Sequence, residues 1–215
     1  MNLLLVHGLW RTPLSFLMLV RRLRGWGYGT EQFGYAAIVQ RYDSIVCRLR
    51  DRLEHLAALG PYSVIGHSLG GLLLRSALPH VSGPPPKHLV MLGTPNRPPR
   101  MARTLGEYWG YRRLMGESGM NLASPAFYAG LPLPGIPYTI VAGTRGLRGR
   151  WSPFGHEPND GIVAVNETRI RDEDPIVLLP VTHTFMMNNA AVQAVIRRAL
   201  TPNDPTLNRQ PPAEL

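Results

Sequence analysis

The feature that most constrains the fold is a five-residue motif between two apolar segments. The motif is Gly66-His67-Ser68-Leu69-Gly70, which fits the pattern G-x-S-x-G. The segment before it, Tyr62 to Ile65, is short and apolar like a buried strand, and the segment from Leu69 to Leu78 is typical of an apolar helix. A strand, a sharp turn and a helix in this order hold a serine hydroxyl clear of a sheet. The motif therefore predicts that Ser68 is a nucleophile.

The residue types of this motif have physical reasons. Gly66 and Gly70 leave room for a tight turn to pack against neighbouring chain, and a serine at the tip of such a turn has a strained backbone. Ser68 also precedes a helix, whose free N–H groups and dipole favour developing negative charge. The simpler alternative is a glycine-rich turn in which Ser68 only caps the helix.

Predicted strands alternate with predicted helices along the chain. Short apolar runs predict strands at Asn2 to Val6, Tyr62 to Ile65, His88 to Leu92, Ile136 to Ala142 and Ile176 to Leu179, and a short element of unspecified type at Ile162 to Val165. A further strand is expected around Tyr28 to Tyr35. Helices are predicted between Thr12 and Gly25, then at Asp43 to Leu59, Leu69 to Leu78 and Thr184 to Leu200. This order favours an α/β fold with a mostly parallel central sheet flanked by helices. A site in such a sheet lies at the carboxyl ends of the strands.

The length of 215 residues fits one compact domain. We expect a single domain over residues 1–200, in which residues 96–134 form a short cap-like insert, and a loose, proline-rich tail over residues 201–215. The apolar start, Met1 to Val6, is short and lacks a preceding basic region, and no apolar run reaches the length of a membrane span. We therefore expect a cytoplasmic protein.

The net charge is +9 and comes almost wholly from arginine, since Lys87 is the only lysine. The arginines are scattered and no nucleic-acid-binding motif accompanies them, so we expect a solvated basic surface and no nucleic-acid partner. A weak attraction to anionic membrane surfaces stays open.

Cys47 is the only cysteine, so an intramolecular disulfide and a thiolate cluster are excluded. We expect its side chain to be buried, as a small apolar residue of its helix. No metal site or cofactor is expected.

A serine hydroxyl needs a neighbouring base. After a G-x-S-x-G turn, the acid and then the histidine follow along the chain. His183 comes after the last predicted strand and before the final helix, which favours it over His156. Asp160, in a turn before Gly161, is the predicted acid that orients this histidine. The competing acids are Glu157, Glu167, Asp172, Glu173 and Asp174.

Acyl transfer also requires hydrogen-bond donors for the developing oxyanion. The backbone N–H of Leu69, directly after the nucleophile, is one predicted donor. The second should come from the loop after the first strand, where Gly8 permits a turn, and we predict the N–H of Leu9, with Trp10 as its competitor. His7 is expected to brace this loop.

These residues resemble the α/β-hydrolase superfamily, in particular small bacterial lipases and esterases of the PGAP1-like group. The similar motifs are Val6-His7-Gly8, residues 66–71, Leu92-Gly93-Thr94-Pro95, Asn159-Asp160-Gly161-Ile162-Val163, and His183 before Phe185-Met186. The resemblance implies an α/β-hydrolase fold, a triad of Ser68, Asp160 and His183, and Leu9 and Leu69 as oxyanion donors. The chain lacks the long lid domain and the transmembrane segment of larger members.

The expected function is hydrolysis of carboxylic esters through an acyl-enzyme, with a lipid or small-molecule acyl ester as substrate. Apolar side chains that could line a substrate pocket are Trp10, Tyr108, Trp109, Met115 and Phe127, although most apolar residues of the insert are expected to pack onto the core. An uncharged ester of short to medium chain length fits such a pocket. A thioesterase, amidase or acyltransferase with the same triad is the alternative, and a lipid- or partner-binding protein without turnover is another. The oligomeric state is left open.

Overall fold

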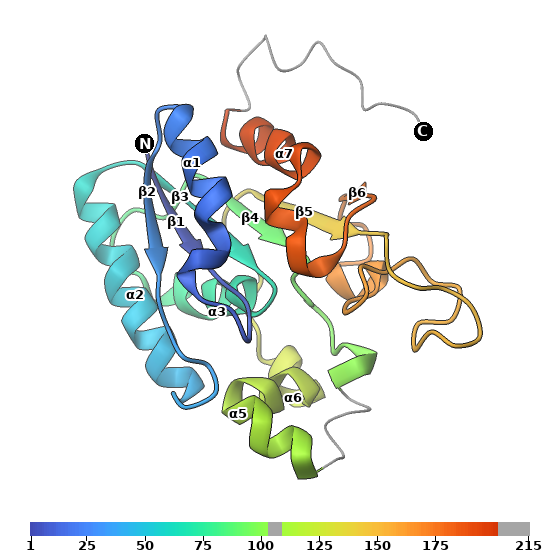
Figure 1. Ribbon diagram of the computed structural model, residues 1–215. Coiled ribbons are helices and arrows are strands. Elements are labelled where there is room, and N and C mark those ends of the chain that lie inside the picture. Colours follow the sequence, from blue (N-terminus) through green and yellow to red (C-terminus); the bar gives the residue numbers. More distant parts are fainter. Residues whose placement is uncertain (103–108, 202–215) are drawn as a thin grey trace.

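The computed structural model describes residues 1–102 and 109–201, and only the backbone for residues 109–114. Its centre is a sheet of six parallel strands in the order β2-β1-β3-β4-β5-β6 (Figure 1). The strands are β1 (Asn2–Val6), β2 (Gly29–Phe33), β3 (Tyr62–His67), β4 (Leu89–Leu92), β5 (Tyr138–Gly143) and β6 (Ile176–Leu179). The predicted α/β class with a parallel sheet is confirmed.

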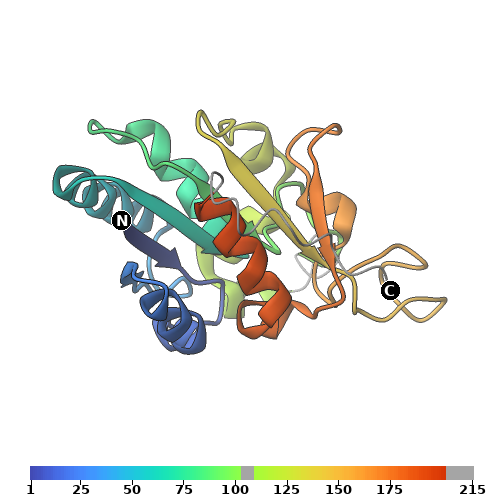
Figure 2. The same ribbon diagram turned by 90° about the horizontal axis from the view of Figure 1, so that it is seen from above.

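Helices cover both faces of this sheet (Figures 1 and 2). One face carries α1 (Leu17–Gly25) and α7 (Ala190–Leu200), and the other carries α2 (Tyr42–Leu59) and α3 (Leu69–Ala77). Strand β1 contributes side chains to the hydrophobic core on each face of the sheet. Leu3 and Leu5 pack with α1 and α7, while Leu4 and Val6 pack with α2 and α3. This two-sided burial explains why the strand is an unbroken apolar run. None of the described helices is long and apolar enough to span a membrane.

The strand order changes direction at β1. The chain moves outward from β1 to β2 and then returns across β1 to β3, so the loops that follow β1 and β3 leave the same edge of the sheet side by side. Val6, at the end of β1, is in register with Gly66 of β3. In open α/β sheets a crevice forms at such a point. The sheet thus brings the Gly8 loop next to the Ser68 turn.

The insert between β4 and β5 contains α5 (Trp109–Ala123) and α6 (Pro125–Ala129). Helix α5 is kinked at Gly116, whose φ of 61° is in the left-handed region. A side chain at this position would collide with the carbonyl of Ile38. The close approach holds the insert against the segment between β2 and α2.

Short 3-10 helices connect several elements: η1 (Pro13–Phe16), η2 (Leu78–His80), η3 (Val165–Thr168) and η4 (His183–Asn188). Two of them bear on the predicted elements. The short element predicted at residues 162–165 consists of a bend, a bridge between Ala164 and Asn159, and the start of η3. The final predicted helix is divided into η4 and α7 because the Asn189 side chain accepts from the N–H groups of Ala191 and Val192 and starts a new helix there.

The expectation for Cys47 is wrong, because its side chain is exposed. Helix α2 buries Ile45, Leu49 and Leu53, which repeat every four residues. Cys47 lies between the first two of these and therefore points away from the core.

Candidate active site

The backbone of Ser68 has the geometry expected of a nucleophile turn. Its φ of 53° and ψ of −122° belong to a region that non-glycine residues rarely adopt. The N–H of Ser68 donates to the Leu92 carbonyl over 2.9 Å, and the N–H of Gly71 donates to the Ser68 carbonyl over 3.0 Å. Strand β4, through Leu92, and helix α3, through Gly71, therefore hold this strained residue from both sides.

Two glycines are required by close packing around the turn. A Cβ atom at Gly66 would collide with the backbone of Gly71, and one at Gly70 would collide with the carbonyl oxygen of Val6. The absence of side chains lets α3 begin directly against the ends of β1 and β3. The helix N-terminus thus lies beneath Ser68, where its dipole favours negative charge.

His183 and Asp160 form a buried pair. The Nδ1 atom of His183 lies 2.7 Å from Oδ2 of Asp160, and the backbone N–H of His183 donates to the Asp160 carbonyl over 2.9 Å. Oδ1 of Asp160 accepts from the N–H groups of Ile162 and Val163, at 3.0 and 2.8 Å. Gly93 packs against the pair, since a Cβ there would lie 3.0 Å from the His183 Nδ1. Both oxygens of the Asp160 carboxylate therefore have hydrogen-bond partners, and these contacts hold the imidazole of His183 in one orientation.

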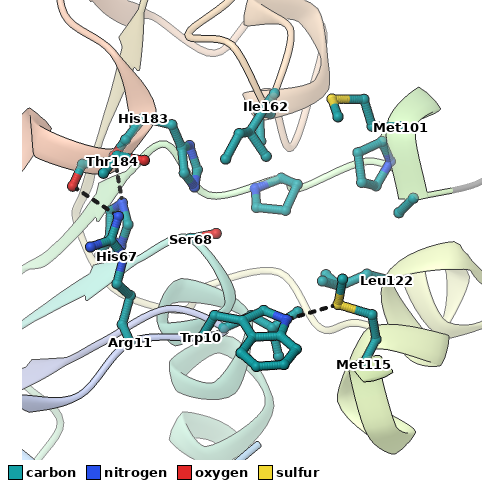
Figure 3. A pocket seen from close by; sticks show the side chains of 15 residues that line it. Trp10, Arg11, His67, Ser68, Met101, Met115, Leu122, Ile162, His183 and Thr184 are labelled. Atoms are coloured by element: carbon teal, nitrogen blue, oxygen red, sulfur yellow. Dashed lines mark hydrogen bonds between the residues drawn. The ribbon is translucent and has the colours of Figure 1, made fainter. Parts of the chain in front are cut away.

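Ser68 and His183 line the same cavity, which has a volume of about 310 Å³ (Figure 3). Figure 3 shows both side chains projecting into it, with Ile162 and Met101 on one side and Trp10 and Met115 on the other. Its lining is mostly apolar and consists of Leu9, Trp10, Arg11, His67, Ser68, Pro95, Pro99, Met101, Ala102, Met115, Leu122, Ile162, Val163, His183 and Thr184. The cavity is suited to an apolar group next to the serine.

The loop after β1 forms a tight turn closed by the N–H of Arg11, which donates to the Gly8 carbonyl over 3.2 Å. Trp10 adopts a φ of 57° in this turn, and its indole N–H donates to the Met115 sulfur over 3.0 Å (Figure 3). This bond joins the loop to the insert across the cavity. Leu9 also lines the cavity, and Leu69 is the first residue of α3, directly after Ser68.

The other predicted substrate-binding residues have different positions. Phe127 is absent from the cavity lining and packs edge-on against Tyr42 of α2, with ring centroids 5.2 Å apart. Its side chain therefore belongs to the core between the insert and α2. Tyr108 and the side chain of Trp109 lie outside the described residues.

The competing acids are engaged elsewhere. Glu167 accepts from the backbone N–H groups of Arg100 and Ala164, and Asp174 binds Arg171. Ion pairs engage the exposed Asp172, with Arg97, and the exposed Glu173, with Arg171, and also the partly buried Glu157, with Arg100. His156 is exposed on the loop before Asp160.

Two basic side chains of the cavity lining, Arg11 and His67, were not among the predicted site residues. Arg11 is the charged side chain among the described lining residues, and it donates to the Thr184 carbonyl over 3.4 Å. His67 belongs to the nucleophile motif and is buried, with 1% of its surface exposed. Its Nε2 lies 3.0 Å from the carbonyl oxygen of His183. Because a carbonyl only accepts, Nε2 carries the proton. Arg11 follows the predicted oxyanion loop directly, a position that could have indicated a pocket residue.

His67 should make the stability of the protein depend on pH. Burial lowers the pKa of its imidazole well below the usual 6.5, and the nearby His183 lowers it further. Burial also lowers the pKa values of His7 and His88. The unfolded chain then binds protons that the folded protein excludes, so stability should be complete above about pH 6.5 and fall as pH decreases below it. Each such histidine contributes a slope of at most about 1.4 kcal/mol per pH unit.

Denaturant unfolding between about pH 5 and pH 8 measures this dependence. In His67→Gln, whose amide can still donate to the His183 carbonyl, the slope below about pH 6.5 should be shallower than in the wild type. An unchanged slope would contradict a neutral, buried His67.

Comparisons with known families and with curated proteins find no match. Solved structures do match. Phospholipase PlaB from Legionella pneumophila is 17% identical with a TM-score of 0.68, and the match covers 93% of this chain and 59% of PlaB. The chain thus spans about three fifths of the length of PlaB.

Two further structures are matched over nearly their whole length. An extracellular α/β-hydrolase from a Paenibacillus species is 15% identical with a TM-score of 0.61, and the match covers 95% of this chain and 99% of that one. A pyrethroid hydrolase from Sphingobium faniae is 15% identical with a TM-score of 0.59, and covers 94% of this chain and 98% of that one. The identities are low, but the sheet order, the nucleophile turn and these matches agree on the architecture, and the chain has the fold of the α/β-hydrolase superfamily.

Proposed function

We propose that the protein is a serine hydrolase that cleaves carboxylic esters, with Ser68 as nucleophile, His183 as general base and Asp160 as the orienting acid. The observation that carries the proposal is the shared cavity: a serine on a strained turn faces the same space as a histidine whose Nδ1 is bound to a buried carboxylate. A serine, a base and an orienting acid are the arrangement that activates a hydroxyl for acyl transfer.

In the proposed reaction, Nε2 of His183 takes the proton of Ser68 as Oγ attacks the ester carbonyl. The negative oxygen of the tetrahedral intermediate accepts from the backbone N–H groups of Leu9 and Leu69. When the C–O bond of the ester breaks, His183 returns the proton to the leaving alkoxide and an acyl-enzyme remains. Water, deprotonated by His183, then attacks the acyl group and releases the acid and Ser68. Asp160 stays ionised and stabilises the charged imidazole in both steps.

The walls of the cavity favour an uncharged acyl chain of short to medium length. Pro95, Met101, Ala102 and Leu122 supply apolar surface, and Met115 bounds the space beside Trp10. Apolar walls stabilise an acyl chain by removing it from water and give little orientation to a polar acyl group. The resemblance to the PGAP1-like lipases and esterases stays a prediction.

A thioesterase with the same residues is the second candidate. A thioesterase of prodiginine biosynthesis from Streptomyces coelicolor matches 94% of this chain at 16% identity, with a TM-score of 0.57. Ester and thioester hydrolysis share the nucleophile and differ in the leaving group, so their separation requires a direct measurement.

A series of p-nitrophenyl esters and matching thioesters of increasing acyl length tests the substrate class. We expect the highest kcat/KM for short to medium esters. Met115→Trp, which fills the cavity, should shift the preferred chain length downward, because acyl carbons lose their space beside Trp10.

Met120→Trp is the matched control, since Met120 lies on the same helix and is absent from the lining. It should leave the chain-length preference unchanged. Cleavage of thioesters or amides alone would replace the ester proposal by the alternative. The lack of any labelling by a fluorophosphonate probe would favour a protein that binds without turnover.

A further inference from the structure

The loop between β5 and Asp160 carries an unusual combination of side chains. Over residues 144–156 it contains three arginines, Arg145, Arg148 and Arg150, and no acidic residue. It also presents two large apolar side chains, Leu147 at 84% and Trp151 at 86% exposure. Large apolar side chains this exposed leave apolar surface in water, which a partner surface could cover.

The three arginines have no carboxylate partner among the described residues. Within the described part of the chain, the Arg148 side chain donates to the Thr144 carbonyl, and the Arg150 guanidinium lies over the Trp151 ring, 4.6 Å from its centroid. Elsewhere on the protein, Arg97 and Arg100 pair with acids. The positive charge of the loop is therefore uncompensated locally and available to an anionic surface.

The loop is held in shape by its own hydrogen bonds. The Leu147 carbonyl accepts from the Ser152 hydroxyl at 2.7 Å and from the Asn159 amide at 3.0 Å, and the Gly149 N–H donates to Gly155. Phe154 turns inward and is 3% exposed. Leu147 and Trp151 are thus presented outward by an ordered loop, which lowers the entropic cost of docking.

The loop extends from the body of the protein, as the gold segment that projects beyond β6 in Figures 1 and 2. It begins at the carboxyl end of β5, the same edge of the sheet from which the Ser68 turn leaves, and its base is bonded to Asn159, next to Asp160. A surface bound by this loop would therefore lie along the edge that contains the cavity.

We propose that residues 144–156 form a docking loop for anionic phospholipid bilayers. Trp151 and Leu147 insert at the level of the headgroups, where an aromatic ring is favoured, while the arginines bind lipid phosphates. A nucleic acid matches the charge and can stack a base on Trp151, but it offers no aliphatic surface for Leu147. A folded acidic protein matches both features only where an apolar patch lies beside its acidic groups. The bilayer matches both.

Sedimentation with vesicles tests the proposal on the whole chain. The probes are vesicles of phosphatidylcholine with phosphatidylglycerol at about two to one, with pure phosphatidylcholine as reference. The wild type should bind the anionic vesicles, and the combined change of Arg145, Arg148 and Arg150 to Gln should weaken binding by about fivefold for each charge removed, more than about fiftyfold in all. The matched control replaces Arg48, Arg50 and Arg52 of α2 with Gln; it removes the same charge from another face and should weaken binding far less.

The apolar part of the contact is measured separately. Trp151→Ser and Leu147→Ser should weaken binding even when added salt screens the arginines. Lipids brominated near the headgroup should quench the tryptophan fluorescence of the wild type. They should have little effect on the tryptophan fluorescence of Trp151→Phe. Equal loss of binding in the loop and α2 variants, or a loop variant that loses only heparin or oligonucleotide binding, would overturn the proposal. Binding by Ser68→Ala should equal that of the wild type, so failure of the proposed hydrolysis and failure of the docking loop are distinguishable.

Discussion

Replacement of Ser68 by alanine is expected to lower kcat for a soluble p-nitrophenyl ester by at least about 10³-fold while the fold is retained. The side chain supplies the attacking oxygen. Thr184 also has a hydroxyl in the described cavity lining, but it follows His183 on η4 and does not occupy the strained turn. Labelling by a fluorophosphonate probe should disappear in the same variant.

A second substitution at this position separates chemistry from folding. Ser68→Gly also removes the hydroxyl, but glycine accepts a φ of 53° without steric strain. It should raise the free energy of unfolding by about 1 kcal/mol while activity is lost, as measured by denaturant unfolding. Ser82→Ala, an exposed serine on the loop after η2, is the control and should change neither quantity. Probe labelling that survives in Ser68→Ala would refute the assignment of the nucleophile.

Asp160→Asn is expected to lower kcat by about 10⁴-fold with little change in structure. The reason lies in the two N–H groups of Ile162 and Val163, which donate to Oδ1. In asparagine the carbonyl oxygen must keep these two bonds, so the NH₂ group is directed at Nδ1 of His183. That atom becomes an acceptor, the proton moves to Nε2, and the imidazole can no longer take the proton of Ser68.

The measurement is the pH dependence of kcat for the wild type, Asp160→Asn and Asp172→Asn. Asp172 has a 90% exposed side chain and pairs with Arg97 on the surface, so its replacement should change kcat by less than about twofold. If Asp160→Asn retained more than about a tenth of the activity, the acid in the proposed mechanism would have to be another residue.

Local sequence was sufficient for the elements around Ser68. The apolar run of β3, the two glycines and the apolar helix α3 are adjacent along the chain, and their requirements are steric: a Cβ at Gly66 or Gly70 has no space. The central strands β3 and β4 were predictable for a similar reason, because a strand buried on both faces is largely apolar. The edge strand β2 contains Thr30, Glu31 and Gln32 and has no such pattern. For residues 162–165 the pattern predicted only a short element of unspecified type, because so short an apolar run does not distinguish a strand from a turn.

The cavity was less predictable because its walls come from distant segments. Met115 and Phe127 lie in the same insert and have similar apolar character, yet Met115 faces the cavity and Phe127 packs on Tyr42. Which side of an insert faces the site depends on how the insert packs against the rest of the protein, and at the kink in α5 Gly116 approaches Ile38 too closely for a side chain. Composition carries no information about such a contact.

The sequence by itself determined the α/β class and the order of strands and helices, and it singled out Ser68, Asp160 and His183, because these depend on residue patterns along one chain segment at a time. Tertiary structure alone decided that His183 meets Asp160 at 2.7 Å, that Arg11 and His67 border the cavity, and that Leu147 and Trp151, which neighbour the 144–156 arginines in sequence, are exposed. The physical reason is that distances and exposure arise from packing between segments far apart in sequence, where each side chain competes with all others for the same space.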